Sequence, residues 1–278
     1  MNSYIFSWNP DDIDHLLRSC EKDDAVKITL RYLQSKDLRI LEAGCGAGRV
    51  VRYLRDRGFV HVSGIEANAQ IVHVLNSRWP DLSIIQGDIL ALPYSSLSFD
   101  VVLSYGVVEH FPEGPLTPLR AIHSVLVDGG IAIVTVPSHN LLRRLIHVGS
   151  HHSSNISGGT ETDICPNPST NTGKVLPYHR QPENGPFFEY HLTKEQFETI
   201  CWESGFDILE SVPVAHIDGL FHIFGPSHFL VTYKDWEFTV YPLGRFLNGL
   251  FSLIPFLHNH MHLCVLRKRG PIPTGEPA

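Results

Sequence analysis

Cysteine is scarce in this sequence, and no two cysteines are closely paired. The five among 278 residues are Cys20, Cys45, Cys165, Cys201 and Cys264. Without a C-x-x-C pair, neither a disulfide framework nor a zinc site is expected, and a reducing compartment is favoured. The first ten residues lack the basic and apolar regions of a signal peptide. No run reaches about 18 apolar residues. We therefore expect a cytoplasmic protein without a transmembrane segment.

Basic charge is also in short supply. Lysine and arginine together number 22 against 29 aspartates and glutamates, so the formal net charge is −7. A chain with this balance has no global basic surface to gather phosphates, and no nucleic-acid partner is expected. The hydrophobic content of 43% and the charged content of 18% are ordinary for a folded protein. The length suits one α/β domain with insertions.

Histidine, by contrast, is frequent, with 17 copies. Two groups stand out, and they comprise His147, His151 and His152, and the alternating His258, His260 and His262. No cysteine or carboxylate completes a ligand set at zinc spacing around them. We therefore expect no metal site and interpret these histidines as ordinary surface or lid residues.

The most informative stretch is an apolar run that ends in three alternating glycines. Residues 38–41 lead into Glu42, and Gly44, Gly46 and Gly48 follow at every second position. An apolar helical pattern begins directly afterwards, so the stretch predicts a buried parallel strand that turns into a helix. Glycine permits positive φ and lets a ligand lie against backbone N–H groups. The start of the helix offers N–H donors to a polar or anionic group.

The glycine spacing separates two families of nucleotide-binding loops. A dinucleotide fingerprint needs a third small residue three positions after the second glycine, and Arg49 stands there. The pattern acidic-x-Gly-x-Gly-x-Gly, from Glu42 to Gly48, instead resembles the first motif of the class I S-adenosylmethionine (SAM)-dependent methyltransferases.

Three later motifs strengthen this resemblance. Glu66 ends the next predicted strand, 22 residues after the first glycine, where a carboxylate would hold a ribose diol. Asp88 and Ile89 match the acid and the apolar neighbour that hold adenine in the family. The sequence at residues 99–102 (Phe-Asp-Val-Val), followed by Glu109-His110, resembles the ubiquinone- and menaquinone-biosynthesis branch.

The resemblance implies a Rossmann-like α/β fold. We expect a seven-stranded, mostly parallel sheet in the order 3-2-1-4-5-7-6 with helices on both faces, because strands and helices of 8–13 residues alternate from 38 to 137. The expected segments are N-terminal helices closing on the cofactor (1–37), the SAM-binding core (38–137), an inserted lid loop, partly disordered (138–190), the remainder of the core (191–213 and 261–269), an aromatic-rich cap insertion (214–260) and a flexible tail (270–278).

The resemblance also implies the cofactor, SAM, and its binding residues. The three glycines and Cys45 approach the methionine part, Glu42 lies near its amino group, Glu66 and Ala67 lie at the ribose, and Asp88 and Ile89 hold the adenine. Ser104 and Tyr105 line the floor of the site. The full expected set is Glu42, Gly44, Cys45, Gly46, Gly48, Glu66, Ala67, Asp88, Ile89, Ser104 and Tyr105.

The candidate base is His110, on the loop after the fourth strand that faces the methyl group in the family. A neutral imidazole suits that task near pH 7, and the alternative is a histidine that only shapes the pocket. Glu109 holds the same loop or contacts the substrate. Tyr178, Tyr190 and His191 reach the site from the lid, or only pack there.

The insertion at 214–260 is dense in aromatic residues and leaves three interpretations open. It is a cap over an apolar acceptor, a dimer surface, or a patch that rests on a membrane. Residues 246–257 are apolar but short and are interrupted by Asn248 and Pro255, so an interfacial helix is allowed and a membrane span is not. The cap is the expectation, and peripheral membrane contact stays open.

Taken together, the sequence predicts a SAM-dependent methyltransferase. The acceptor is an O, N or C atom of a small apolar or amphiphilic molecule, because neither an Asn/Asp-Pro-Pro-aromatic motif nor a Pro-Cys nucleophile follows the fourth strand. Two alternatives stand beside it: a catalytically silent methyltransferase-like binding protein, and a nicotinamide-dependent oxidoreductase. The identity of the acceptor and the oligomeric state stay open.

Overall fold

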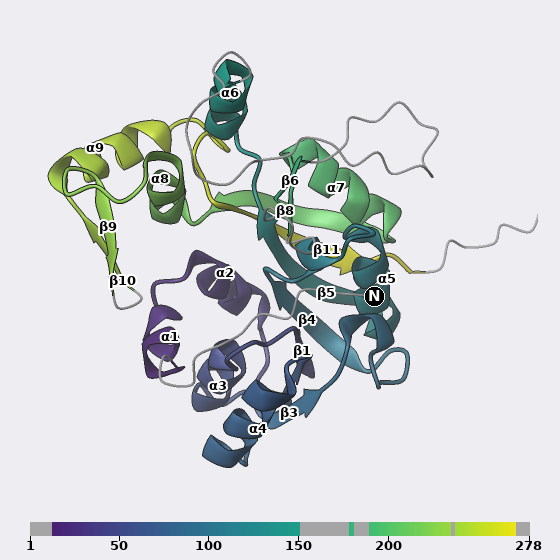
Figure 1. Cartoon of the computed structure of the whole chain (residues 1–278). Helices are drawn as coiled ribbons and strands as arrows, with labels where there is room; N and C mark the ends of the chain where they lie inside the picture. Colours follow the sequence, from purple (N-terminus) through teal and green to yellow (C-terminus); the bar gives the residue numbers. More distant parts are fainter. Residues whose placement is uncertain (1–12, 151–177, 181–188, 235–236, 271–278) are drawn as a thin grey trace, which may run out of the picture.

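The computed structural model describes residues 13–150, 178–180, 189–234 and 237–270 (Figure 1). The elements of the main domain are α1 (Ile13–Ser19), α2 (Asp24–Tyr32), β1 (Ile40–Ala43), α3 (Arg49–Asp56), β2 (Val62–Glu66), α4 (Ala69–Arg78), β3 (Ser83–Gln86), β4 (Phe99–Tyr105), α5 (Leu116–Val125), β5 (Leu126–Pro137), α7 (Lys194–Glu203), β8 (Phe206–Val214) and β11 (Met261–Lys268). Two short 3-10 helices are η2 (Ile89–Ala91) and η3 (Val108–His110).

Seven strands form one sheet in the order β3-β2-β1-β4-β5-β11-β8. Strands β1 to β5 pair in parallel, and β11 runs antiparallel between β5 and β8. The predicted strand order and the predicted mostly parallel sheet are therefore confirmed. Because β1 to β4 are parallel, their carboxyl ends meet at one edge of the sheet, where the family places its cofactor.

Helices cover both faces of the sheet, as Figure 1 shows. One apolar core gathers side chains of α1, α2, α3 and α4, and the other gathers those of α5 and α7. Strand β1 is buried on both faces because Ile40 faces the first core and Leu41 faces the second. The alternation of a strand then directs Glu42 toward the face of α1 to α4.

The segment expected as a loop after β5 begins with a helix instead. Helix α6 (Leu141–Ser150) starts after Asn140, whose Oδ1 accepts from the N–H of Arg143 at 2.8 Å. Two short strands, β6 (Tyr178–Arg180) and β7 (Glu189–His191), pair antiparallel. The lid-loop prediction is wrong for these parts of the chain. An N-cap asparagine before an amphipathic run is a helix signal that sequence reading overlooked here.

Strand β5 starts directly after α5, at Leu126, and includes Gly129 and Gly130. Its register on β4 shifts between the pair Phe99–Leu126 and the pair Val101–Ile131. Gly129 has a φ of +74°, so the irregularity is taken up at a residue that tolerates it.

The aromatic-rich insertion forms a small helical and hairpin unit. Its elements are α8 (His216–Phe224), β9 (Val231–Lys234), β10 (Glu237–Val240) and α9 (Pro242–Phe251). Phe221, Tyr233 and Phe238 pack together, with ring centroids 4.7–5.9 Å apart. Within the described residues, no helix is both long and apolar enough to cross a membrane.

Candidate active site

The glycine loop between β1 and α3 adopts a conformation that only glycine accepts without strain. Gly44, Gly46 and Gly48 have φ values of +81°, +50° and +68°. A Cβ on Gly44 would lie 2.6 Å from Cγ2 of Val107, at the end of the fourth strand. The loop is thus packed directly against the segment that follows β4, and it leaves no room for a side chain at the first glycine.

Three backbone N–H groups of this loop already have hydrogen-bond partners within the protein. The amides of Gly44 and Cys45 both donate to the carbonyl oxygen of Ile65 at 2.9 Å. The amide of Gly46 donates to Oε2 of Glu66, also at 2.9 Å. These three N–H groups therefore hold the loop in shape, which removes part of the ordering cost of binding a ligand.

Glu66 and Asp88 stand at the carboxyl ends of neighbouring strands. Besides Gly46, Glu66 accepts from the N–H of Asn68 at 2.9 Å, and the exposed Ala67 lies between these two residues. Asp88 is exposed, and its Oδ1 accepts from the N–H of Leu90. Ile89 is 5% exposed, so most of its side chain belongs to the core. Two carboxylates thus lie at the sheet edge beside the glycine loop.

Glu42 lies in β1, two residues before Gly44, and its side chain is on the face of the sheet that α1 to α4 cover. It is 4% exposed, and its Oε2 accepts from the N–H of Val51 in α3 at 3.2 Å. Burial raises the pKa of Glu42 to about 8, although the nearby charge of Arg49 acts in the opposite direction. Glu42 is therefore protonated in the free protein at pH 7, and a cation placed beside it would favour ionisation.

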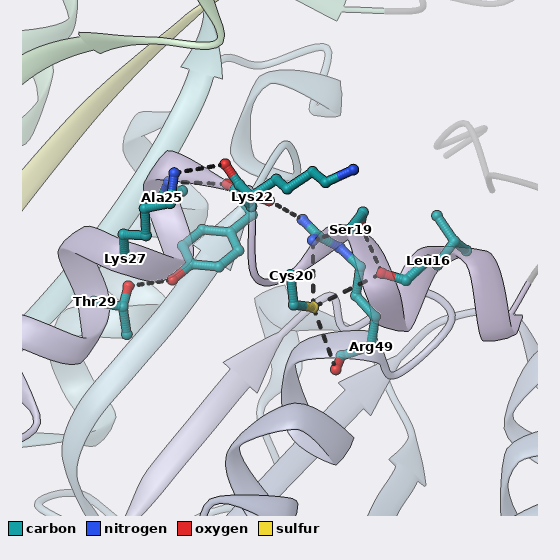
Figure 2. A network of polar contacts seen from close by, with 10 residues as sticks. Leu16, Ser19, Cys20, Lys22, Ala25, Lys27, Thr29 and Arg49 are labelled. Atoms are coloured by element: carbon teal, nitrogen blue, oxygen red, sulfur yellow. Dashed lines mark hydrogen bonds and ion pairs between the residues drawn. The ribbon is translucent and has the colours of Figure 1, made fainter. Parts of the chain in front are cut away.

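Arg49 joins the N-terminal helices to the start of α3, as Figure 2 shows. Its guanidinium donates to Oδ2 of Asp23 at 2.6 Å, and the same side chain lies 3.3 Å from Oγ of Ser19 and 3.5 Å from Sγ of Cys20. The residue that breaks the dinucleotide fingerprint thus has a positive structural role. It fastens α1 and α2 beside the glycine loop.

Replacing Arg49 with methionine is expected to destabilise the protein by about 1–3 kcal/mol, because Asp23 keeps a half-buried charge without its partner. Urea denaturation measures this change. Arg52→Met is the matched control in the same helix, where the lost ion pair is more exposed, and it should cost less than about 1 kcal/mol. Equal losses in the two variants would show that the Arg49–Asp23 contact does not fasten the helices.

Ser104 and Tyr105 point to opposite faces of β4 rather than forming one floor. The hydroxyl of Tyr105 makes a short hydrogen bond with Oγ1 of Thr29 in α2, so Tyr105 ties a second N-terminal helix to the sheet. Ser104 is fully buried, and its Oγ has no hydrogen-bond partner in the described part of the chain. Ser104 stays a candidate for ligand contact because its buried hydroxyl has no such partner.

Glu109 and His110 lie on η3, directly after β4. Glu109 is 1% exposed, and burial raises its pKa well above the usual range, which favours its neutral form. Its Oε2 has no hydrogen-bond partner among the residues that the structure describes. Oε1 lies 3.9 Å from Nε2 of His110, whose side chain is 17% exposed. A neutral carboxyl beside a partly accessible imidazole is thus available to a bound molecule.

A second carboxylate in this region was not predicted. Nε2 of His191 donates to Oε1 of Glu189 at 2.8 Å, and both residues lie on β7, two positions apart on one face. Burial alone would raise the pKa of Glu189, but the bond from His191 and the nearby His110 outweigh burial and lower it. Glu189 is therefore ionised close to His110. The period-two spacing of Glu189 and His191 was the sequence signal for this pair.

Arg143 of α6 fixes the protonation of two imidazoles. It donates to Nδ1 of His191 at 3.1 Å and to Nδ1 of His260 at 3.0 Å. Arginine can only donate, so both Nδ1 atoms accept and each neutral ring carries its proton on Nε2. Burial lowers the pKa of His260 to about 3. The predicted site included neither Arg143 nor His260. Helix α6, which carries Arg143, was not expected.

Asp218, His222 and His260 also come together at this position. Their ligand atoms lie within 4.8 Å of one another, and the rings of His222 and His260 stack at 4.2 Å. The argument that no carboxylate accompanies the alternating histidines is therefore wrong for His260. The guanidinium of Arg143 nevertheless occupies Nδ1 of His260. Its positive charge opposes a cation there, so the absence of a metal site stays our prediction.

Tyr190 and Tyr178 were both predicted to reach the site from the lid. The hydroxyl of Tyr190 donates to the carbonyl oxygen of Pro112 at 2.7 Å, so it fastens β7 to the loop after η3. The backbone of Tyr178 pairs with His191 in the β6–β7 ladder. The position of the Tyr178 side chain lies outside the described part of the structure. Of the lid candidates, only His191 joins the polar cluster beside η3.

The comparisons with known proteins agree with this geometry. The family described as "Methyltransferase domain" matches residues 41–134, from β1 into β5. A Bos taurus relative named "Probable tRNA methyltransferase 9B" is 31% identical over 35% of this chain and 21% of its own length. Malonyl-[acyl-carrier protein] O-methyltransferase of Enterobacter lignolyticus is 30% identical over 45% of this chain and 49% of its own length. The alignments thus span half or less of these relatives.

Residues 41–134 thus match a methyltransferase domain, and the sheet around them has the strand order expected for the class I fold. SAM is the cofactor of this domain family. A solved structure also shares the fold over most of the chain. This is the methyltransferase in a complex with the Haloferax volcanii Trm112 methyltransferase activator, which is 17% identical with a TM-score of 0.58 over 95% of this chain and 98% of that one.

The residues of this methyltransferase domain fit the cofactor. SAM carries a ribose diol, an adenine and an ammonium group. The domain offers carboxylate acceptors at Glu66 and Asp88 on the edge where β2 and β3 end, and the buried carboxyl of Glu42. The glycine loop is already shaped between them.

Proposed function

We propose that the protein transfers the methyl group of SAM to an O, N or C atom of a small amphiphilic molecule. The observation that carries this proposal is the Glu66 carboxylate, which stands at the end of β2 and accepts from the glycine-loop amide of Gly46. That contact joins the ribose position and the methionine position in one preformed unit. When bound, SAM supplies an electrophilic methyl group.

The roles of the binding residues follow from their positions. Glu66 accepts the two ribose hydroxyl donors, and Asp88 accepts from the adenine amino group. Glu42 ionises beside the ammonium group, because a cation compensates the desolvation that raises its pKa. The glycine loop excludes side chains from the path of the methionine part. Holding the reactants in a fixed orientation supplies a large share of the rate enhancement of a transfer reaction.

The proton of a protonated acceptor goes to His110. This side chain follows β4, is partly accessible, and has Glu109 and Glu189 as its acidic neighbours. Burial favours the neutral form of Glu109, which can donate a hydrogen bond, whereas the lowered pKa of Glu189 favours its ionised form. An ionised carboxylate stabilises positive charge that develops on a nearby imidazole, so the two acids divide their roles by environment. Arg143 and His191 keep Glu189 in place.

Glu189→Gln is expected to lower kcat roughly tenfold while SAM binding stays unchanged. The amide keeps the shape and the bond to His191 but removes the charge. Transfer of a radiolabelled methyl group to an acceptor measures the rate, and titration with SAM measures the binding. Glu195→Gln, an exposed acid on α7, is the matched control. A Glu189→Gln variant as active as the control would remove Glu189 from the mechanism.

The acceptor class is tested by methyl transfer from radiolabelled SAM to quinone precursors, fatty acyl acids and phospholipids, with transfer RNA as a competitor class. The tRNA alternative comes from the name of the bovine relative. It is disfavoured by the net charge of −7, since nucleic-acid binding depends on basic surface. Label in the lipid or quinone fraction supports the proposal. Label only in RNA contradicts it, and binding of SAM without transfer to any class favours the catalytically silent alternative.

A further inference from the structure

Helix α9 exposes large apolar side chains on its outer side. Its inner side is held close to the protein, because Gly244 is buried and a Cβ there would lie 2.2 Å from the carbonyl oxygen of Leu230. Asn248 also faces inward, where its Oδ1 accepts from Nε2 of His258 at 3.0 Å. On the outer side, Leu243 and Phe246 are 50% and 66% exposed. The outer side of a surface helix in a water-soluble domain is ordinarily polar.

The apolar side of α9 continues onto helix α6. The N–H groups of Leu141 and Leu142 donate to the carbonyl oxygens of Phe256 and Leu257 at 3.0 and 2.9 Å, so the start of α6 lies beside the segment after α9. Figure 1 shows both helices at the same end of the molecule. We define the α6–α9 apolar surface by its exposed side chains, Leu141, Leu145, Ile146, Leu243, Phe246, Leu250, Leu253 and Ile254.

This surface concentrates the exposed apolar side chains of the protein. Its eight members are almost half of the seventeen large hydrophobic residues that are exposed within the described ranges. Leu145 and Leu253 are 67% and 77% exposed, which leaves most of each side chain in water. Single exposed apolar residues need no explanation, but a group of this size on two adjoining helices indicates a binding surface.

The charge around this surface identifies its partner. Although the whole chain has a net charge of −7, no aspartate or glutamate occurs from residue 129 to 160 or from residue 238 to 275. Exposed arginines accompany both helices, Arg144 on α6 and Arg245 on α9. An apolar surface that is built from stretches of chain without acidic residues and is flanked by basic side chains matches a bilayer that contains anionic lipids. A bilayer of this kind would repel the acidic remainder of the chain, so the charge also orients the protein.

We propose that the α6–α9 apolar surface docks on an anionic lipid bilayer. The apolar side chains enter the interfacial region, and Arg144 and Arg245 meet the headgroups. No helix in the described ranges could cross the bilayer, so the contact is peripheral. Helix α6 follows β5 and carries Arg143 of the polar cluster. If the proposed function holds, docking brings an amphiphilic acceptor to the same edge of the sheet.

The test is co-sedimentation of the full-length chain with phosphatidylcholine vesicles that contain about 30% phosphatidylglycerol, or none. We expect binding to the anionic vesicles and at least about tenfold weaker binding to the neutral ones. The double variant Leu145→Glu/Phe246→Glu should reduce binding to anionic vesicles at least about tenfold. Val60→Glu, at a 50% exposed residue before the amino end of β2, is the matched control and should bind as the wild type does.

Two further measurements keep the outcomes distinct. The variants must melt within a few degrees of the wild type and must bind SAM equally well, which separates loss of docking from loss of fold or of the proposed function. Failure of the wild type to bind vesicles, or equal binding by the double variant, would overturn the proposal. Analytical ultracentrifugation tests whether a second copy of the chain occupies the surface instead. If the wild type is a dimer that does not bind vesicles, and Leu145→Glu/Phe246→Glu is a monomer, the surface is a dimer interface and the proposal is overturned.

Discussion

Glu66→Ala is expected to weaken the binding of SAM and S-adenosylhomocysteine at least about 100-fold, because a buried carboxylate that bonds a diol contributes roughly 1.5–3 kcal/mol for each hydrogen bond. Glu66 is 8% exposed and also holds the amide of Gly46. The variant therefore loses the ribose acceptor and one anchor of the glycine loop. Calorimetric titration measures both ligands, and both should weaken by the same factor, since they share the ribose.

Two companion variants separate these effects. Glu66→Gln keeps one carbonyl oxygen for the amide of Gly46 but loses the charge and the acceptor for the amide of Asn68. It should bind SAM at least about tenfold more weakly, with a smaller loss of melting temperature than Glu66→Ala. Asp81→Ala removes an exposed acid before β3 and should bind SAM as the wild type does. A Glu66→Ala protein with unchanged affinity would show that the carboxyl end of β2 does not hold the ribose.

Glu42→Gln is expected to make the protein more stable at pH 8 than the wild type, relative to pH 5. Burial raises the pKa of Glu42 to about 8 in the folded chain, from an ordinary value of 4.5 in the unfolded chain. As the pH rises between these values, the unfolded chain releases the proton and the folded chain keeps it. Stability contributed by the protonated carboxyl is thus complete below about pH 4.5 and is lost as the pH approaches 8.

Glutamine has the shape of the protonated carboxyl and does not titrate. The free energy of unfolding of Glu42→Gln, minus that of the wild type, should therefore increase by about 2–5 kcal/mol between pH 5 and pH 8. Urea denaturation at a series of pH values measures this difference. Glu113→Gln, in the exposed loop after η3, is the control and should show no such trend. A flat difference for Glu42→Gln would mean that the carboxyl is ionised when buried.

Sequence reading located the cofactor side of the site because its signals are local. Gly44, Glu66 and Asp88 each stand at the end of a strand or within two residues of it, and parallel strands bring their ends to one edge. The roles of these residues remain predictions, whereas the sheet order that brings them together is confirmed. Arg49, at the third position of the dinucleotide fingerprint, was also informative. Its guanidinium bonds Asp23, which a small residue at this position could not do.

The acceptor side was mostly beyond sequence reading because it is assembled from distant segments. Arg143, Glu189 and His260 are separated by 46 and 71 residues. They come together because both β11 and the segment after β7 lie beside the end of β5. Their pairing therefore depends on the tertiary fold rather than on any local pattern. Helix α6 is a different case, since the N-cap Asn140 and the amphipathic run after it were visible in the sequence. Because the residues after this helix are polar, the whole segment was interpreted as a loop.

The most direct test of the account is calorimetric titration of the purified wild-type protein with SAM, S-adenosylhomocysteine and NAD. The geometry of Glu66, Asp88 and the glycine loop predicts micromolar binding of the first two ligands and no measurable binding of NAD, because Arg49 occupies the position that a dinucleotide fingerprint keeps small. Binding of NAD in preference to SAM, or no binding of SAM and S-adenosylhomocysteine, would contradict the proposed function and leave only the fold.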